Sequence, residues 1–223
     1  MKVDAIAFDL DGTLIETNDA WHHGLDMTLK QLGKQEGVTK AFFYENHVGV
    51  EMKKVISFHL DLSESELGKA VQTFINNFLS SIDFVKVNDN VIEVLEYVSE
   101  MTERTAIITN TYGNVVDGVF TNLRSRNVDL NKYFRTIVTH DLVEEGKPNP
   151  DIIFYACDKL EVKPENMVFV EDSVSGVKAG KNAGCYVIAI TNTISEEKLR
   201  AAGADKIITN LLELKNIISE LSD

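Results

Sequence analysis

The chain has 223 residues, 44% hydrophobic and 26% charged, which is typical of a globular protein with room for one large domain and an insertion. The formal net charge is −13, whereas proteins that bind nucleic acids usually have a basic face, so we expect no nucleic-acid partner. The N-terminus does not resemble a signal peptide, and no apolar run reaches the length of about 20 residues that spans a membrane, so we expect no membrane partner. The two cysteines, Cys157 and Cys185, have no metal or redox spacing, which fits a reducing compartment. The chain is therefore expected to be cytoplasmic.

The first predicted strand spans residues 4–9, where the apolar segment AIAF leads into Asp9. No good strand candidate follows between residues 17 and 82. Ser63 and Glu66 in this region have the spacing of a capping box at a helix N-terminus. Apolar side chains recur at helical intervals in three stretches: residues 20–33, 51–60 and 63–82. We therefore expect an inserted helical domain over residues 17–82.

Strand and helix patterns alternate over the rest of the chain. Short β-branched runs predict five more strands: residues 105–109, 136–139, 167–171, 186–190 and 206–209. Amphipathic stretches lie between several of them: residues 90–101, 114–126 and 151–160. Since the strands are apolar on both faces, helices should cover both sides of the sheet. The pattern predicts an α/β fold, a doubly wound, parallel, Rossmann-like sheet formed by residues 1–16 and 83–223.

Polar side chains follow the predicted strands. In an open parallel sheet, ligands bind where the carboxyl ends of the strands meet, so these side chains should converge. They are Asp9 and Asp11, Thr109 and Asn110, Glu171 and Asp172, together with Lys147 in the loop before the helix at 151–160. Clustered carboxylates repel one another, and a divalent cation would resolve that repulsion. Hard oxygen ligands without a histidine pair favour Mg²⁺, and a lysine and a threonine nearby favour a phosphate ligand.

Four segments in this order resemble the motifs of the haloacid dehalogenase-like (HAD) superfamily. They are DLDGT at 9–13, TN at 109–110, GKPNP at 146–150 and ED at 171–172. A fifth segment, SGVKAGKNAG at 175–184, resembles the stretch that follows the fourth motif. We interpret its small residues as close packing of a helix on the sheet with a C-terminal stop, rather than as a phosphate-binding loop.

The resemblance implies the roles of the carboxylates. Asp9 would be the nucleophile that attacks phosphorus and becomes an aspartyl phosphate. Asp11 would protonate the leaving group and then activate water, and its backbone carbonyl would bind Mg²⁺. Asp9 and Asp172 would also be metal ligands. Glu171 would bind the metal through a water molecule or orient the site.

The resemblance also implies how the phosphate would be bound. Thr109 would bind the transferring phosphoryl group together with the backbone of Asn110. Lys147 would tie the nucleophile to the phosphate. The expected partner is thus a small-molecule phosphate ester, and the protein is expected to be a monomer or a weak homodimer.

The helical insertion resembles the small cap, of the C1 type, found in the β-phosphoglucomutase and phosphoglycolate phosphatase branch. Asp11 argues against the dehalogenases and phosphonatases, which lack this residue, and Lys53 and Lys54 do not match the phosphonatase lysine in register. The mutases carry a cap arginine after a glycine, whereas the insertion has no arginine and offers Val50 and Glu51 there.

Trp21 stands where the mutases have a cap histidine, with His22 beside it. We predict that Trp21 and His22 line a substrate pocket. Four aromatic residues are expected in the core of the cap: Trp21, Phe42, Phe43 and Phe58. The other histidines, His47, His59 and His140, have no ligand spacing and are interpreted as structural or surface residues.

These observations predict a Mg²⁺-dependent phosphatase that hydrolyses a small phosphomonoester through an aspartyl-phosphate intermediate. One alternative is a phosphomutase of the β-phosphoglucomutase type, which the missing cap arginine disfavours. The other is a non-catalytic phospholigand-binding protein, which the intact motifs disfavour.

Overall fold

The computed structural model describes residues 2–48, 50 and 52–222, so Glu51 lies outside the described residues. Within them, a six-stranded parallel sheet has the strand order β5-β4-β1-β6-β7-β8. The strands are Ala5–Phe8 (β1), Thr105–Ile108 (β4), Thr136–Val138 (β5), Met167–Glu171 (β6), Tyr186–Ile190 (β7) and Lys206–Ile208 (β8). The predicted fold class is therefore confirmed, and so is each of the six predicted strands.

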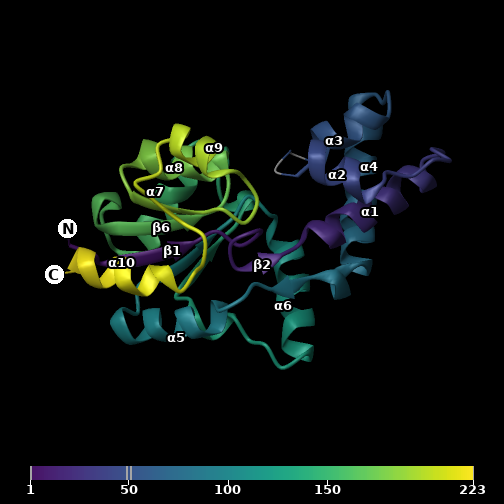
Figure 1. Ribbon diagram of the computed structural model, residues 1–223. Helices are drawn as coiled ribbons and strands as arrows, with labels where there is room; N and C mark the ends of the chain where they lie inside the picture. The colour runs from purple at the N-terminus through teal and green to yellow at the C-terminus, as the bar shows by residue number, and fades with distance from the viewer. Residues whose placement is uncertain (1, 49, 51, 223) are drawn as a thin grey trace.

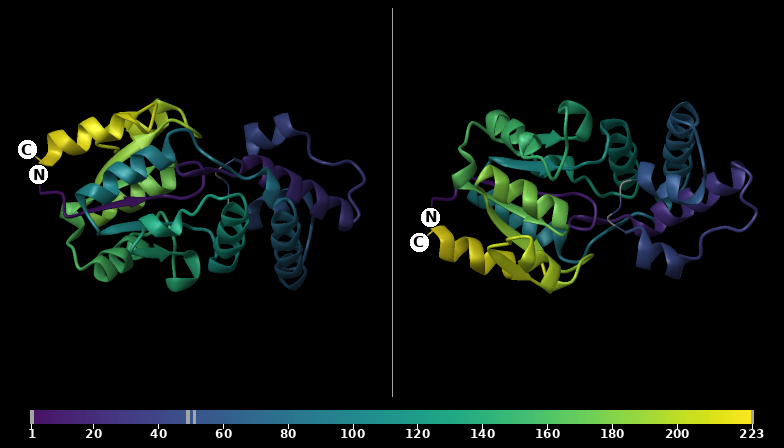
Figure 2. Two further views of the ribbon diagram at one scale, coloured as in Figure 1. Left: turned by 90° about the horizontal axis from the view of Figure 1, so that it is seen from below. Right: turned by 90° about the horizontal axis from the view of Figure 1, so that it is seen from above.

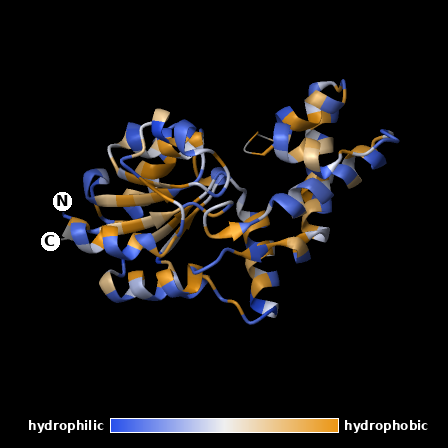
Figure 3. Ribbon diagram, viewed as in Figure 1, coloured by the Kyte–Doolittle hydropathy of each residue, from blue (hydrophilic) through white to orange (hydrophobic). Residues whose placement is uncertain are grey.

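Helices cover both faces of the sheet, as Figure 1 shows. Because successive residues of a strand point to opposite faces, Ile6 and Phe8 join one hydrophobic core and Ala5 and Ala7 the other. The first core lies under Val91–Met101 (α5), Gly113–Ser125 (α6) and Glu213–Ser222 (α10). The second lies under Asp151–Leu160 (α7), Val174–Ala183 (α8) and Glu196–Ala201 (α9). Figure 3 shows the hydrophobic strands between helices with hydrophilic outer faces.

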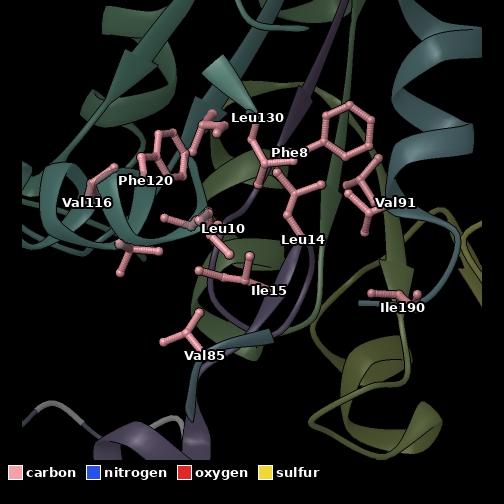
Figure 4. Close-up of a cluster of buried hydrophobic side chains, with 14 of the residues drawn as sticks. Phe8, Leu10, Leu14, Ile15, Val85, Val91, Val116, Phe120, Leu130 and Ile190 are labelled. Atoms are coloured by element: carbon pink, nitrogen blue, oxygen red, sulfur yellow. The ribbon is translucent and has the colours of Figure 1, made fainter. Parts of the chain in front are cut away.

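The loop after β1 is fixed by its apolar residues. Leu10, Leu14 and Ile15 are almost completely buried, and Figure 4 shows them among Phe8, Val85 and their neighbours. Burial of these side chains on both sides of Asp11 holds the loop against the core. The polar residues of the DLDGT segment are thereby held at the edge of the sheet.

Four helices form the insertion and extend away from the two chain termini (Figures 1 and 2). They are Asn18–Gln31 (α1), Lys40–Asn46 (α2), Met52–His59 (α3) and Glu64–Ser80 (α4). The helices expected at 20–33, 51–60 and 63–82 correspond to α1, α3 and α4, whereas α2 was not predicted. The Ser63 N–H donates to Glu66 Oε2 at 2.9 Å, so Glu66 satisfies a backbone donor at the start of α4 as expected. No described helix is long and apolar enough to cross a membrane.

The insertion is joined to the sheet domain by a two-stranded antiparallel ribbon that was not predicted. Ile15–Glu16 (β2) pairs with Lys86–Val87 (β3), which follows the 3-10 turn Ile82–Phe84 (η1). Three further 3-10 turns lie in the sheet domain: Asn131–Tyr133 (η2), His140–Leu142 (η3) and Pro164–Asn166 (η4). Strands of two residues have no readable periodicity, so only the long-range pairing reveals them.

The expectation that four aromatic residues lie in the cap core is wrong for two of them. Phe43 is 2% exposed and Trp21 stacks on Phe74, with ring centroids 4.9 Å apart. Phe42 is 38% exposed and Phe58 is 67% exposed. Adjacent helical residues such as Phe42 and Phe43 point about 100° apart, so a short surface helix buries only one of them.

The small residues of α8 pack closely on the sheet, as predicted. A Cβ atom on Gly180 would lie 2.6 Å from Val187 Cγ2 and 3.0 Å from Phe169 Cδ1. Gly184 ends the helix with a φ of 92°, the left-handed conformation that favours glycine. The glycines of this segment therefore serve packing and helix termination.

Gly180→Val should destabilise the fold by about 1–3 kcal/mol, because the new side chain would overlap Val187 and Phe169. Gly68→Ala is the matched control: Gly68 lies within α4 with no atom near its would-be Cβ, so alanine should stabilise by about 0.5–1 kcal/mol. Urea unfolding of both variants tests the pair. A neutral Gly180→Val would contradict the close packing.

Candidate functional site

Lys147 lies at the centre of a buried charge cluster at the carboxyl edge of the sheet. Its Nζ donates to Glu171 Oε2 at 2.8 Å, forms an ion pair with Asp9 Oδ1, and lies 3.2 Å from the Ile108 carbonyl. The side chains of these three ionisable residues are all less than a tenth exposed. In such a weakly screened environment, charge interactions are much stronger than in water. The structure thus brings Asp9, Lys147 and Glu171 together, as the sequence predicted.

The ionisation of the cluster is strongly perturbed. Burial raises the pKa of Asp9, and the charge on Glu171 raises it further, against the opposing effect of Lys147. Burial likewise raises the pKa of Asp172, with Glu171 and Asp9 adding to it. For Lys147, burial alone would lower the pKa, but the Asp9 and Glu171 carboxylates outweigh it and raise the pKa. The cluster therefore has more carboxyl groups than one lysine can neutralise, and Asp9 and Asp172 hold their protons more tightly than free carboxyl groups do.

Glu171 is held in place by the backbone that follows it. Its Oε1 accepts hydrogen bonds from the N–H groups of Asp172 and Ser173, both at 2.9 Å. Gly176, in the first turn of α8, leaves the room that the carboxylate fills, because a Cβ there would lie 1.6 Å from Glu171 Oε2. Glu171 is consequently fixed on both oxygens.

The carboxylates of Asp9, Glu171 and Asp172 converge on one point. One oxygen of each lies within 4.8 Å of the others, and all three residues are buried. Gly12, with a φ of 88°, passes so close that a Cβ would lie 2.0 Å from Asp172 Oδ2. Three buried carboxylates with a single lysine as their cation fit Mg²⁺, which prefers hard oxygen ligands.

Asp11 accepts hydrogen bonds from two threonine hydroxyls. Thr111 Oγ1 donates to Asp11 Oδ2 at 2.7 Å, and Thr109 Oγ1 lies 3.3 Å from the same oxygen. The Thr111 N–H donates to Thr109 Oγ1 at 3.0 Å, which orients the second hydroxyl. Thr111 was missed in the sequence analysis, although it is the next polar residue after the TN segment.

Three asparagine side chains fix the loops around the site. Asn110 Oδ1 accepts from the Lys147 N–H at 2.8 Å, and Asn110 Nδ2 donates to the Lys147 carbonyl at 2.9 Å. Asn88 and Asn192 each donate to the Gly12 carbonyl, at 3.0 and 2.8 Å. Asn88 and Asn192 were not predicted, because their contacts join segments far apart in the chain.

A cavity of about 730 Å³ extends from these residues to the cap. Its walls include Asp9, Asp11, Thr109, Asn110, Lys147, Glu171 and Asp172, which is the complete set predicted for the sheet edge. From the cap, Trp21 lines it but His22 does not: His22 Nε2 lies 2.6 Å from the Val38 carbonyl. Lys53 and Lys54, which do not match the phosphonatase lysine in register, are exposed and also border the cavity.

The chain is similar to known phosphatases over its whole length. The family model described as haloacid dehalogenase-like hydrolase matches residues 6–190. A phosphorylated carbohydrates phosphatase from Thermotoga maritima is 27% identical over 98% of this chain and 100% of that protein. A phosphoglycolate phosphatase from Nitrosospira multiformis is 26% identical over 100% of this chain and 98% of that protein.

A solved structure shares the fold. The protein described as a predicted phosphoglycolate phosphatase from Haemophilus somnus superimposes with a TM-score of 0.85, covering 98% of this chain and 99% of that one. Its sequence identity is 20%, so this likeness concerns the architecture. The two proteins therefore share the sheet, the insertion and the arrangement of the two, although few of their residues are identical.

Lys147→Met should cost about 3–5 kcal/mol of stability at neutral pH, because it leaves Asp9 and Glu171 buried without their cation. The loss should shrink as the pH falls, since these carboxyl groups then bind protons. Lys163→Met is the control: the Lys163–Glu165 pair is exposed and 3.8 Å long, so its loss should be near zero. Unfolding in urea at several pH values measures both, and a pH-independent loss in Lys147→Met would contradict the charge explanation.

Proposed function

Because the chain belongs to the haloacid dehalogenase-like hydrolase family, we propose that it is a Mg²⁺-dependent phosphatase acting through an aspartyl-phosphate intermediate. The class of enzyme predicted from the sequence, a phosphoric monoester hydrolase, is the one that its named relatives represent. One observation carries the proposal. A buried aspartate, Asp9, is paired with Lys147 beside the carboxylates of Glu171 and Asp172. A second aspartate, Asp11, accepts hydrogen bonds from the hydroxyls of Thr109 and Thr111 instead.

Asp9 is the proposed nucleophile. Its carboxylate oxygen attacks the phosphorus atom, the bond from phosphorus to the ester oxygen breaks, and Asp11 protonates the departing alkoxide. In the second half, Asp11 takes a proton from water, which attacks the same phosphorus and releases inorganic phosphate and free Asp9. Lys147 donates to the phosphoryl oxygens and stabilises their charge in the transition state. The Thr109 hydroxyl has a single proton, so it turns from Asp11 to donate to the phosphoryl group when the substrate binds, and Thr111 keeps its hydrogen bond to Asp11.

Mg²⁺ would be held by Asp9, Asp172 and the backbone carbonyl of Asp11, with Glu171 behind them, and it would neutralise the negative charge that accumulates on the phosphoryl group. The two threonines then have a distinct task. Their hydrogen bonds orient the Asp11 carboxylate toward the side of the cavity where the leaving group departs. Two carboxylates two residues apart thus perform different chemistry.

We propose that residues 17–82 form a cap on a sheet domain of residues 1–16 and 83–223. The β2–β3 ribbon supports this division, because both connections run through it side by side. Closure of the cap about this ribbon would exclude water before the first step. The cavity between the two parts would then enclose the leaving group.

A phosphomutase is not favoured. It must hold a bisphosphate, and residues 17–82 contain no arginine for the distal phosphate. Lys53 and Lys54 of the cap border the cavity, but Glu144 and Glu145 of the sheet domain border it as well, so these four residues together carry no net charge. A purely binding protein is not favoured either, since it would not need Asp11 and its two threonine partners.

Asp9→Asn should lower phosphate release from small phosphomonoesters by about a thousandfold or more, because the amide is not a nucleophile. The assay compares Mg²⁺ with excess chelator, and chelator should abolish the wild-type activity. Asp117→Asn, at an exposed residue of α6, is the control and should be unchanged. Wild-type rates in Asp9→Asn would refute the nucleophile assignment.

Stabilisation by Mg²⁺ should grow as the pH rises. The raised pKa values of Asp9 and Asp172 mean that protons compete with the metal at mildly acidic pH, and the competition ends when the carboxyl groups ionise. Thermal unfolding with and without Mg²⁺ between mildly acidic and alkaline pH measures this without any substrate.

Asp172→Asn completes that test. It should raise the unfolding temperature of the metal-free protein, because one of the repelling carboxylates is gone, and should abolish the Mg²⁺ response. A Mg²⁺ response that persists in Asp172→Asn, or that is strongest in acid, would rule out this metal site.

A further inference from the structure

The cavity contains an apolar groove between the cap and the sheet domain. Helix α4 of the cap lies beside α6 of the sheet domain, as both views of Figure 2 show. The two touch where Gly118 meets Leu79: a Cβ on Gly118 would lie 2.6 Å from Leu79 Cδ2. Neither residue lines the cavity, but their contact holds α4 against α6 beside it.

Apolar residues of both helices line the cavity. On α4 they are Ile75 and Val71, four residues apart and therefore on one helix face. On α6, Val115 lies one turn before Gly118, and Tyr112 precedes the helix. Ile75, Val71, Val115 and Tyr112 all line the cavity that also contains Asp9 and Asp11. We call these four residues, with Trp21, the apolar groove.

Four of the five groove residues are at least partly exposed, whereas Val115 is buried beneath them. Tyr112 is 48% exposed, although it is a large aromatic residue at the edge of the catalytic cavity. Val71, Ile75 and Trp21 are partly exposed. Partly exposed apolar side chains that converge in a concave site are the usual lining of a ligand pocket.

The five groove residues are uncharged. Among the described residues, the charged groups nearest to the cap side of the cavity come from other elements: Lys53 and Lys54 border it from α3, and Glu144 and Glu145 border it from the sheet domain. A second anionic group on the substrate would therefore lose its hydration without gaining a partner in the groove.

We propose that the groove receives the leaving group of the substrate, and that this group is uncharged and apolar, of the arylalkyl or branched alkyl class. The inference rests on the proposed function. The cavity volume, about 730 Å³, lies in the range of roughly 300–1,000 Å³ that suits ligands much larger than a phosphate ion. The ester would lie with its phosphoryl group at Asp9 and its apolar group between α4 and α6.

Alkyl phosphomonoesters with apolar and polar leaving groups test the preference. Benzyl phosphate should exceed glycerol 3-phosphate and 2-phosphoglycolate in kcat/KM by about tenfold or more, since apolar contacts of a few methylene groups discriminate by this factor. All three are esters of alkyl alcohols, so each leaving group needs the proton that Asp11 supplies. Higher kcat/KM for either polar ester would overturn the inference.

Ile75→Asn should reduce kcat/KM for benzyl phosphate by about tenfold or more, chiefly through KM, and change the polar esters less than about threefold. Asn76→Ala, on the exposed side of the same helix, should change none of them. Tyr112→Ser, at an exposed residue of the opposite wall, repeats the test in case Ile75→Asn unfolds. An equal loss for all three esters would mean that the groove is only a contact made on cap closure, which also overturns the inference.

Binding can be measured without turnover because Trp21, in the groove, is the single tryptophan of the chain. Benzylphosphonate should change its fluorescence and bind at least about tenfold more tightly than methylphosphonate, with Mg²⁺ present. Tighter benzylphosphonate binding without hydrolysis of any ester would refute the proposed function but support the groove. Hydrolysis with no preference in rate or binding would support the function and refute the groove.

Discussion

The burial of four charged side chains at one edge of the sheet is the constraint on which the rest of the structure depends. Removing carboxylates from water is costly, and a single lysine compensates only part of the negative charge of Asp9, Glu171 and Asp172. The protein offsets this cost with backbone donors to Glu171, with the Lys147 ion pairs and, as we propose, with a divalent cation. A cluster with too little positive charge favours a ligand that supplies positive charge, as Mg²⁺ does. The bound cation then attracts a phosphate, which needs positive charge around it.

The fold keeps the cluster rigid by means of groups that carry no charge. Asn110 joins the loop after β4 to the backbone of Lys147, and Asn88 and Asn192 hold the Gly12 carbonyl from two other loops. Apolar residues on both sides of Asp11 are buried in the core (Figure 4). These contacts preorganise the reacting groups, so little reorganisation is needed at the moment of reaction.

In the proposed mechanism, the insertion separates the choice of substrate from the chemistry. The residues that would transfer the phosphoryl group all come from the sheet domain, whereas α4 and Trp21 of the cap provide most of the apolar groove. The ribbon β2–β3 lies between these two parts. Changes in the cap can therefore alter which ester is bound while the charge cluster stays the same, which agrees with the different substrate names of the relatives.

The sequence by itself determined the six strands of the sheet, the helical nature of the insertion and which polar residues meet at the carboxyl edge of the sheet. These follow from local signals: apolar runs set the strands, and polar residues directly after a strand must lie at the sheet edge. Only the tertiary structure decided the β2–β3 ribbon, the outward position of Phe42 and Phe58, the turn of His22 toward Val38, and the contacts of Thr111 with Asp11. Each depends on which remote segment packs against a residue, and no pattern within one segment contains that information.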